Sequence, residues 1–216
     1  MSDVCILVEG ETEARFVRDV LAPYLTDKNV QAYHLNFKGH VNFDRLDRML
    51  SGVFGGRGRK HVSMMIDLFR IDTDWPGFEA LPENASGAEK VTRIEQATAA
   101  EIQKRHPDWN VDERFIPYIQ LHEFEALLFA APAELSRVSG IGYSSIENVI
   151  QECGTPENIN SGSETAPSKR LIRLSRAGRY DKTVVGVEVP KIVGIDIIRS
   201  QCPHFNEWVT RLERTA

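Results

Sequence analysis

The chain has 216 residues, of which 42% are hydrophobic and 26% charged, and its formal net charge is −5. These values predict one folded α/β domain, or a core domain with an added helical part, and they exclude a disordered chain. The acidic balance argues against a protein that coats nucleic acid by bulk charge. It remains compatible with a nuclease whose acidic residues bind metal ions.

Membrane and secretory signals are missing from the sequence. No apolar run approaches the length of a membrane span, and the first residues lack the basic and apolar regions of a signal peptide. The cysteines Cys5, Cys153 and Cys202 form no CxxC pair and are odd in number, which argues against a disulfide framework or a zinc site. We therefore expect a cytoplasmic protein with no membrane partner.

The N-terminal half alternates predicted strands with predicted helices. Residues 4–8 (VCILV) form an uninterrupted apolar run, typical of a strand buried on both faces, and an apolar stripe predicts a helix from Thr12 to about Leu25. This alternation predicts a parallel sheet flanked by helices. The further elements that we expect are strands at 30–36, 61–66 and 115–120 and helices at about 42–53, 88–106 and 122–131.

The loops between these elements and the segment that follows them predict how the chain is divided into parts. Residues 54–59 are a basic, glycine-rich loop, and residues 68–86 are long enough for a functional loop. From residue 132 we expect short helices, a mobile stretch at 154–167 and a last helix at 205–214. The expected division is an α/β core at 1–131 and a mainly helical extension at 132–216 packed on it, with one compact domain as the alternative.

Acidic residues stand where buried strands end. Glu9 follows the first strand directly, and Asp67 ends the third. Ligands of parallel sheets bind beyond the carboxyl ends of the strands, so both side chains should project into one crevice. Glu13 is either part of the same site or an acid that complements a helix dipole, and Gly10 permits the tight turn between them.

More acids follow the third and fourth strands. Asp72 and Asp74 are candidate ligands, although Asp is also common in ordinary turns. Glu123 and Glu125 reach the same edge, but residues two apart on a helix do not share a face, so one of them should serve another role. His122 is more typical of a hydrogen-bonded helix start than of a ligand. Convergent carboxylates of this kind suit Mg²⁺ or Mn²⁺.

Two basic runs are candidate contacts for phosphate, with a solvated surface as the alternative. Walker, GxSxG and Rossmann glycine motifs are absent. The candidate contacts are Arg57, Arg59, Lys60, Lys169, Arg170 and Arg173.

The motifs resemble a known family. A strand that ends in Glu-Gly and a parallel strand that ends in Asp look like the Toprim domain of topoisomerases, primases and overcoming-lysogenization-defect nucleases. The runs VEGETE, IDLFRIDTDWPGF, LHEFEALLF, APSKRL and IRSQCPHFNEW resemble one family of uncharacterised bacterial Toprim-like proteins, often found beside an ATPase gene. The resemblance implies a Toprim-like parallel sheet and a role in antiviral or mobile-element defence with an ATPase partner.

Carried over to this chain, Glu9 looks like the Toprim glutamate, an acid or base beside the metal, and Asp67 looks like the first residue of the Asp-x-Asp pair. The sequence departs at Phe69, which occupies the place of the second aspartate, and the next acid is Asp72. Either Asp72 enters the site, or Glu123 or Glu125 replaces the missing carboxylate, or a ligand has been lost.

Three hypotheses of function follow. The first is a Mg²⁺- or Mn²⁺-dependent nuclease of DNA or RNA, with Glu9 and Asp67 catalytic and metal-binding. The second is a non-catalytic Toprim-like module that binds and regulates an ATPase subunit, and the third is a purely structural domain. The sequence leaves open the substrate, its strandedness and a homo-oligomer.

Overall fold

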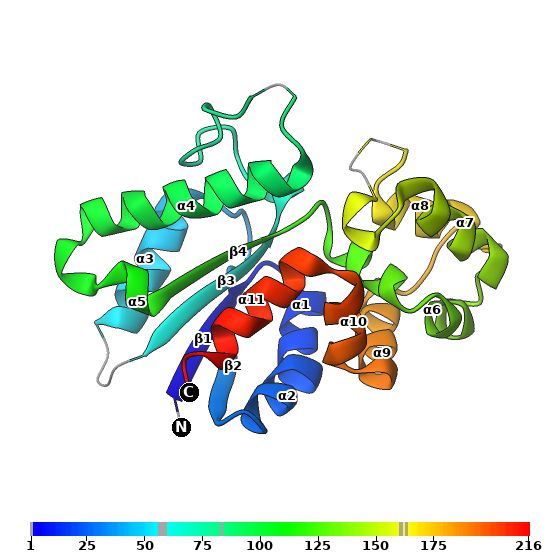
Figure 1. Ribbon diagram of the computed structural model, residues 1–216, viewed down its shortest axis with the longest axis horizontal. Coiled ribbons are helices and arrows are strands. Elements are labelled where there is room, and N and C mark those ends of the chain that lie inside the picture. The colour runs from blue at the N-terminus through cyan, green and yellow to red at the C-terminus, as the bar shows by residue number, and fades with distance from the viewer. Residues whose placement is uncertain (1, 56–59, 83, 160–161, 163) are drawn as a thin grey trace.

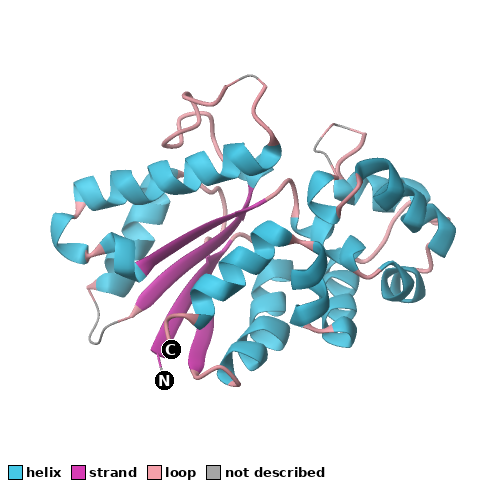
Figure 2. Cartoon of the chain, viewed as in Figure 1, coloured by secondary structure: helices cyan, strands magenta, loops and turns pink. Residues whose placement is uncertain are grey.

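The sheet has four parallel strands in the order β2-β1-β3-β4, within residues 2–55, 60–82, 84–159, 162 and 164–216, which this computed structural model describes. The strands are β1 (Ser2–Val8), β2 (Val30–Asn36), β3 (His61–Asp67) and β4 (Phe115–Gln120) (Figure 1). Helices cover both faces of the sheet, and more helices follow at one end (Figure 2). The predicted α/β class, parallel sheet and helical C-terminal part are confirmed.

The helix after β1 is continuous but contains a wider turn. It consists of α1 (Glu11–Phe16), the π-helical turn η1 (Val17–Leu21) and α2 (Ala22–Thr26). Pro23 lies just beyond the wider turn and has no N–H to donate to the helical ladder, so a regular α-helix could not run through it undisturbed.

On one face of the sheet, α3 (Phe43–Phe54) and α4 (Gly87–Arg105) pack against the strands. Cys5 and Leu7 of β1 point into this core. Asn42 caps α3 by accepting a hydrogen bond from the N–H of Arg45 at 2.9 Å, and Ser86 caps α4 in a capping box. Short helices follow α4, namely η3 (Pro107–Trp109) and α5 (Val111–Arg114).

On the other face, the C-terminal helices join α1 in one continuous core. They are α9 (Lys182–Val193), α10 (Ile195–Gln201) and α11 (Pro203–Glu213). Trp208 of α11 donates a hydrogen bond to Ser63 of β3 at 2.8 Å and stacks on Tyr118 of β4, with ring centroids 4.4 Å apart. The last helix, α11, therefore packs directly on the sheet.

A smaller group of helices extends beyond the sheet, at the right of Figure 1. It contains α6 (Pro132–Ser139), α7 (Tyr143–Cys153), η5 (Pro156–Asn158) and α8 (Pro167–Leu174). Part of the stretch expected to be mobile is fixed, because buried Glu157 accepts hydrogen bonds from the N–H groups of His204 and Phe205 at 3.0 and 2.9 Å. None of the helices in the described part of the chain has the length and apolar character that a membrane crossing requires.

The predicted helix at 122–131 is wrong in type. The segment forms the 3₁₀-helical run η4 (Phe124–Ala130), and all of its residues are buried. His122 has a φ of 67°, in the left-handed region, which turns the chain sharply between β4 and η4. Burial on every side leaves no polar face, so the apolar pattern that predicted a one-sided helix was misleading.

Gly186 sets the distance between α9 and α1. A Cβ at this position would lie 2.5 Å from Cγ2 of Thr12 and 3.2 Å from the ring of Phe124. Gly186→Ala should therefore lower the free energy of unfolding by about 1–3 kcal/mol through overpacking, measured by urea denaturation.

The matched control is Gly52→Ala in α3, where an added Cβ meets nothing within 4 Å. That variant should gain about 0.4–1 kcal/mol, because alanine restricts the unfolded chain and favours a helix. Equal gains in both variants would show that α9 is not closely packed on α1.

Candidate functional site

The two central strands end side by side at a topological switch point. From β1 the chain crosses to β2 on one side, and from β3 it crosses to β4 on the other. In parallel α/β sheets this arrangement opens a crevice at the carboxyl ends of the strands, where ligands bind. Glu9 follows β1 directly and Asp67 is the last residue of β3, so both acids stand at this end of the two central strands.

Four carboxylates gather there, from Glu9, Glu13 of α1, Asp67 and Glu125 of η4. The residues Glu13, Asp67 and Glu125 are only 6%, 7% and 0% exposed. Burial raises the pKa of Asp67 well above its usual value, and the negative charges of Glu13, Glu9 and Glu125 raise it further. Burial likewise raises the pKa of Glu13, against the opposing charge of Lys182.

Lys182, the first residue of α9, supplies the compensating charge. Its Nζ lies 3.1 Å from Oε1 of Glu125, and the hydroxyl of Tyr180 donates to the same oxygen at 2.8 Å. Burial lowers the pKa of Lys182, but the charges of Glu125, Glu13 and Asp67 outweigh it, so the pKa is raised overall. The lysine therefore stays charged and holds Glu125 in place.

Two buried carboxylate oxygens in the cluster accept no hydrogen bond from any described residue. Oε1 of Glu9 pairs with Nε of Arg70 at 2.9 Å. In contrast, Oε2 of Glu9 and Oε2 of Glu125 are buried and have no hydrogen-bond partner among the described residues. Burial raises the pKa of Glu9, the charge of Glu13 adds to this, and Arg70 opposes it. Unsatisfied buried acceptors are costly, and they mark places where a proton or a cation would be stabilised.

The carboxylate oxygens of the cluster are suitable ligands for a divalent cation, but the side chains are not positioned to bind one as they lie. Carboxylate oxygens are the ligands that Mg²⁺ prefers. However, no three acidic, histidine or cysteine side chains in the described part of the chain stand close enough together to hold an ion as they lie. A bound ion would require rotation of these side chains toward one another.

The acids predicted from the loop after β3 are placed elsewhere. Oδ2 of Asp72 lies 2.7 Å from Nε2 of His40, and Asp74 is exposed. The described contacts join neither residue to the four carboxylates. Asp72 therefore has its ion pair with His40, on the loop before α3.

Glu123 and Glu125 make separate contacts in the structure. Glu123 accepts hydrogen bonds from the backbone N–H and the hydroxyl of Ser168, at 2.8 and 3.0 Å, and so fixes the start of α8. Only Glu125 joins the cluster. His122 packs beside Gly87 at the start of α4, and burial together with the charge of Lys90 lowers its pKa.

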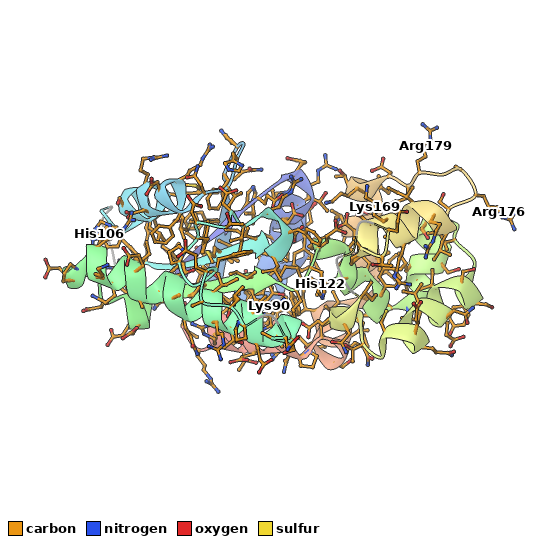
Figure 3. The ribbon with its side chains drawn as sticks, turned by 90° about the horizontal axis from the view of Figure 1, so that it is seen from above. Lys90, His106, His122, Lys169, Arg176 and Arg179 are labelled. Atoms are coloured by element: carbon orange, nitrogen blue, oxygen red, sulfur yellow. The ribbon has the colours of Figure 1, made fainter. Side chains whose placement is uncertain are left out.

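The basic residues predicted to contact phosphate lie in different parts of the structure. Arg170 is 3% exposed and pairs with Glu152 at 2.8 Å, so it joins α8 to α7 and does not face solvent. Lys60 precedes β3 and therefore lies at the opposite edge of the sheet from Asp67. Lys169 and Arg173 of α8 are exposed. The view from above shows Lys169 on the helical part beside the sheet (Figure 3). Arg57 and Arg59 lie outside the described residues.

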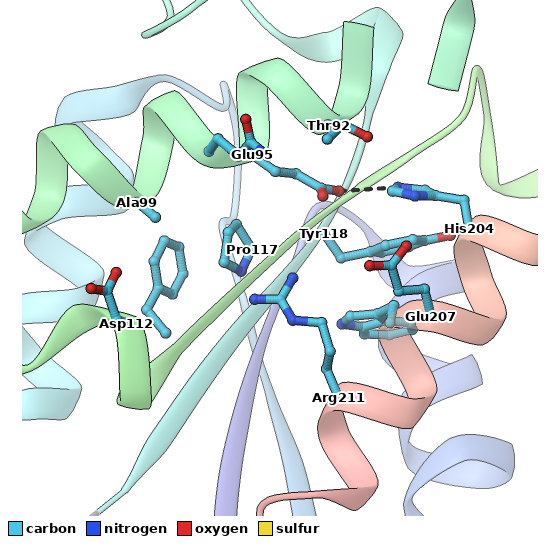
Figure 4. A pocket seen from close by; sticks show the side chains of 12 residues that line it. Thr92, Glu95, Ala99, Asp112, Pro117, Tyr118, His204, Glu207 and Arg211 are labelled. Atoms are coloured by element: carbon cyan, nitrogen blue, oxygen red, sulfur yellow. Dashed lines mark hydrogen bonds and ion pairs between the residues drawn. The ribbon is translucent and has the colours of Figure 1, made fainter. Parts of the chain in front are cut away.

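A separate pocket of about 200 Å³ lies over the open edge of β4, between α4 and α11. Glu95 accepts a hydrogen bond from the N–H of Ile119 at 2.7 Å, and Nε2 of His204 lies 3.0 Å from Glu95 and 3.1 Å from the carbonyl of Ile119 (Figure 4). These side chains satisfy backbone groups that an edge strand would otherwise expose. We assign this pair a structural role.

Lys182 and Tyr180 are site residues that sequence reasoning missed. The available signal was local: Asp181 caps α9 by accepting from the N–H of Val184 at 2.9 Å, which marks a helix start. Nothing in the sequence indicates that the first residue of this helix, Lys182, contacts Glu125.

Comparison with protein families assigns the chain. The model described as a domain of unknown function (DUF4276) matches residues 8–213. The chain belongs to the DUF4276 family. No curated protein and no solved structure matches it significantly. The DUF4276 match runs from the last residue of β1 to the last residue of α11, so it includes all four carboxylates and Lys182.

The raised pKa of Asp67 gives a pH-dependent prediction for this DUF4276 protein. The folded protein holds the Asp67 proton more tightly than the unfolded chain, whose pKa is near 3.8, so ionisation destabilises the fold as pH rises above that value. Asp67→Asn should therefore raise the free energy of unfolding at pH 7, and the gain should vanish near pH 3.8 and below. Urea denaturation in EDTA buffer at both pH values measures it.

Asp27→Asn is the matched control, because Asp27 is exposed at the other edge of the sheet, just after α2. An Asp67→Asn variant that is less stable than the wild type at pH 7 would show that ionised Asp67 stabilises the fold.

Proposed function

We propose that this DUF4276 protein is a Mg²⁺- or Mn²⁺-dependent phosphodiesterase that hydrolyses nucleic acid at the cluster of Glu9, Glu13, Asp67 and Glu125. One observation carries the proposal: the buried carboxylates of Glu13, Asp67 and Glu125 meet the half-buried Glu9 at the switch point, and one oxygen each of Glu9 and Glu125 lacks a hydrogen-bond partner among the described residues. Buried like charges destabilise a fold, and such arrangements concentrate at functional sites. The Toprim resemblance of the strand-end acids supports the same chemistry.

Each residue has a distinct role in the proposal. Glu9, Asp67 and Glu125 would hold the ion, which when bound neutralises phosphate charge and favours ionisation of a water molecule. Glu9 is suited to move a proton, because its raised pKa lies closer to neutral pH than that of an exposed glutamate. Lys182 orients Glu125 through their 3.1 Å ion pair. Arg70 has a 68% exposed side chain and can reach a phosphate from the solvent side.

Glu125 is the best replacement for the second aspartate of the Toprim pattern. Phe69 stands in that position and cannot bind a cation through oxygen. Glu123 is occupied at the start of α8, whereas Glu125 is fully buried and contributes to the raised pKa of Asp67. The proposed ligand set is therefore assembled from β1, β3 and η4.

The wider setting of the proposal follows the family resemblance. We place the protein in the cytoplasm, in antiviral or mobile-element defence, with an ATPase subunit as partner. The free thiols of Cys5, Cys153 and Cys202 agree with a reducing compartment.

The proposal predicts cleavage that depends on a divalent ion. The wild-type protein, with and without its ATPase partner, is incubated with labelled single- and double-stranded DNA and RNA and with Mg²⁺ or Mn²⁺. Glu9→Gln and Asp67→Asn should each lower the cleavage rate about 100-fold or more, because each removes a carboxylate from the reacting centre.

Asp27→Asn should stay within about twofold of the wild type, as expected for a surface substitution. Circular dichroism of every variant confirms that the fold is retained. If the wild type cleaves none of these substrates under any of these conditions, the protein is not a metal-dependent nuclease.

A second candidate function is a non-catalytic module that binds and regulates an ATPase. Lys182 already neutralises part of the cluster, and the described side chains do not form a closed metal site, which favours this alternative. The two functions differ in their predicted affinity for metal ions.

Titration with Mn²⁺, followed by electron paramagnetic resonance, separates the two candidates. A nuclease should bind Mn²⁺, and Asp67→Asn and Glu125→Gln should each weaken that binding at least about tenfold. If the protein changes the activity of the ATPase but shows no carboxylate-dependent binding of Mn²⁺, the second candidate is supported and the first is excluded.

A further inference from the structure

An apolar pocket of about 420 Å³ begins at Leu68, the residue after Asp67, and lies on the α4 side of the sheet. Its walls come from the chain that follows Asp67 and from the first turns of α4. The residues that form it include Leu68, Phe69, Ile71, Phe78, Leu81 and Lys90. Its volume is within the range of about 300–1,000 Å³ that is usual for small-molecule sites.

Phe69 is unusually accessible for its position. It lies in the short 3₁₀ turn η2 (Leu68–Arg70), two residues after Asp67, and it is 51% exposed. The neighbouring Arg70 has a 68% exposed side chain that already reaches Glu9. Phe69 and Arg70 thus offer an exposed aromatic ring and an exposed guanidinium group, two side-chain types that bind nucleobases through stacking and cation–π contact.

The pocket and the cluster share one edge of the sheet. Gly87 at the start of α4 packs against Leu121 and His122, which follow β4, and burial together with the charge of Lys90 lowers the pKa of His122. Lys90 and His122 lie close together in the view from above (Figure 3). A strand whose phosphate reaches Asp67 would therefore place a neighbouring base near Phe69, with Lys90 near the backbone.

We propose that this pocket receives an unpaired base of the substrate strand, so that the protein acts on single-stranded or locally unpaired nucleic acid. The inference rests on the proposed hydrolysis of nucleic acid. A base inside a duplex is stacked and paired, and it could enter the pocket only by flipping out, which costs a few kcal/mol.

The charge of the protein favours a base over other apolar occupants. With a net charge of −5, the chain cannot bind a polyanion through bulk attraction, so part of the affinity must come from contacts that do not depend on charge. Stacking provides such a contact, with about 1–3 kcal/mol for each base. Lys90 provides a local positive charge in an otherwise apolar wall.

The test is fluorescence anisotropy of the full chain with labelled oligonucleotides of roughly 12 nucleotides, in EDTA, where metal-dependent cleavage cannot proceed. Single strands should bind at least about tenfold more tightly than the matching duplex. Phe69→Ala should weaken single-strand binding by about tenfold or more, and Phe69→Trp should preserve it.

Tyr143→Ala is the matched control, because Tyr143 of α7 is also exposed, at 45%, and α7 lies at the far end of the molecule (Figure 1). It should leave the affinity unchanged, and circular dichroism checks that both variants are folded. An abasic position scanned along the oligonucleotide should reproduce the loss at one site only.

The results separate this inference from the proposed function. Equal affinity for single strand and duplex, or unchanged binding by Phe69→Ala, overturns the base pocket even if cleavage is observed. Phe69-dependent binding of single strands in EDTA, together with no cleavage in the separate assays with Mg²⁺ and Mn²⁺, supports the pocket and rejects the hydrolase.

Discussion

The candidate site is governed by an excess of negative charge, because three buried carboxylates and the half-buried Glu9 meet the ammonium group of Lys182. Glu9, Glu13, Asp67 and Glu125 outnumber the positive charges that the structure pairs with them, since Lys182 pairs with Glu125 and Arg70 pairs with Glu9 from the solvent side. The raised pKa values of the first three express this imbalance. Either protons remain on the cluster or a cation joins it, and both states are responses to the same excess of negative charge.

Apolar packing connects the carboxylate cluster to the C-terminal helices, which share one core with β1 and α1. Lys182 reaches the cluster only because α9 packs closely on α1, where Gly186 leaves room for Thr12. Asp181 begins that helix, so the lysine is held at its first residue. If α9 moved away, Glu125 would lose its ion pair with Lys182. The site therefore joins residues 9 and 182 through helix packing, which agrees with a family match over residues 8–213.

The sequence predicted what depends on local pattern and missed what depends on distant packing. Apolar runs identified the strands, and the parallel pairing of β1 with β3 brings Glu9 and Asp67 to the same end of the sheet. No rule based on local sequence could predict the ion pair of Lys182 with Glu125 or that of Arg170 with Glu152. The segment 122–131 failed for a related reason: burial on all sides removed the polar face by which a helix is recognised.

Phe69 connects the proposed metal site with the proposed base pocket, because it follows Asp67 by two residues and lines the pocket. A fifth carboxylate close to Asp67 would add repulsion to a cluster that already lacks positive charge. Glu125 avoids part of that cost, because it arrives from a different element with Lys182 and Tyr180 already bound to it. Position 69 is then free for an aromatic ring at the mouth of the site. On the proposed function, the departure from the Toprim pattern exchanges a metal ligand for a contact with the base, while the count of nearby acids is maintained from η4.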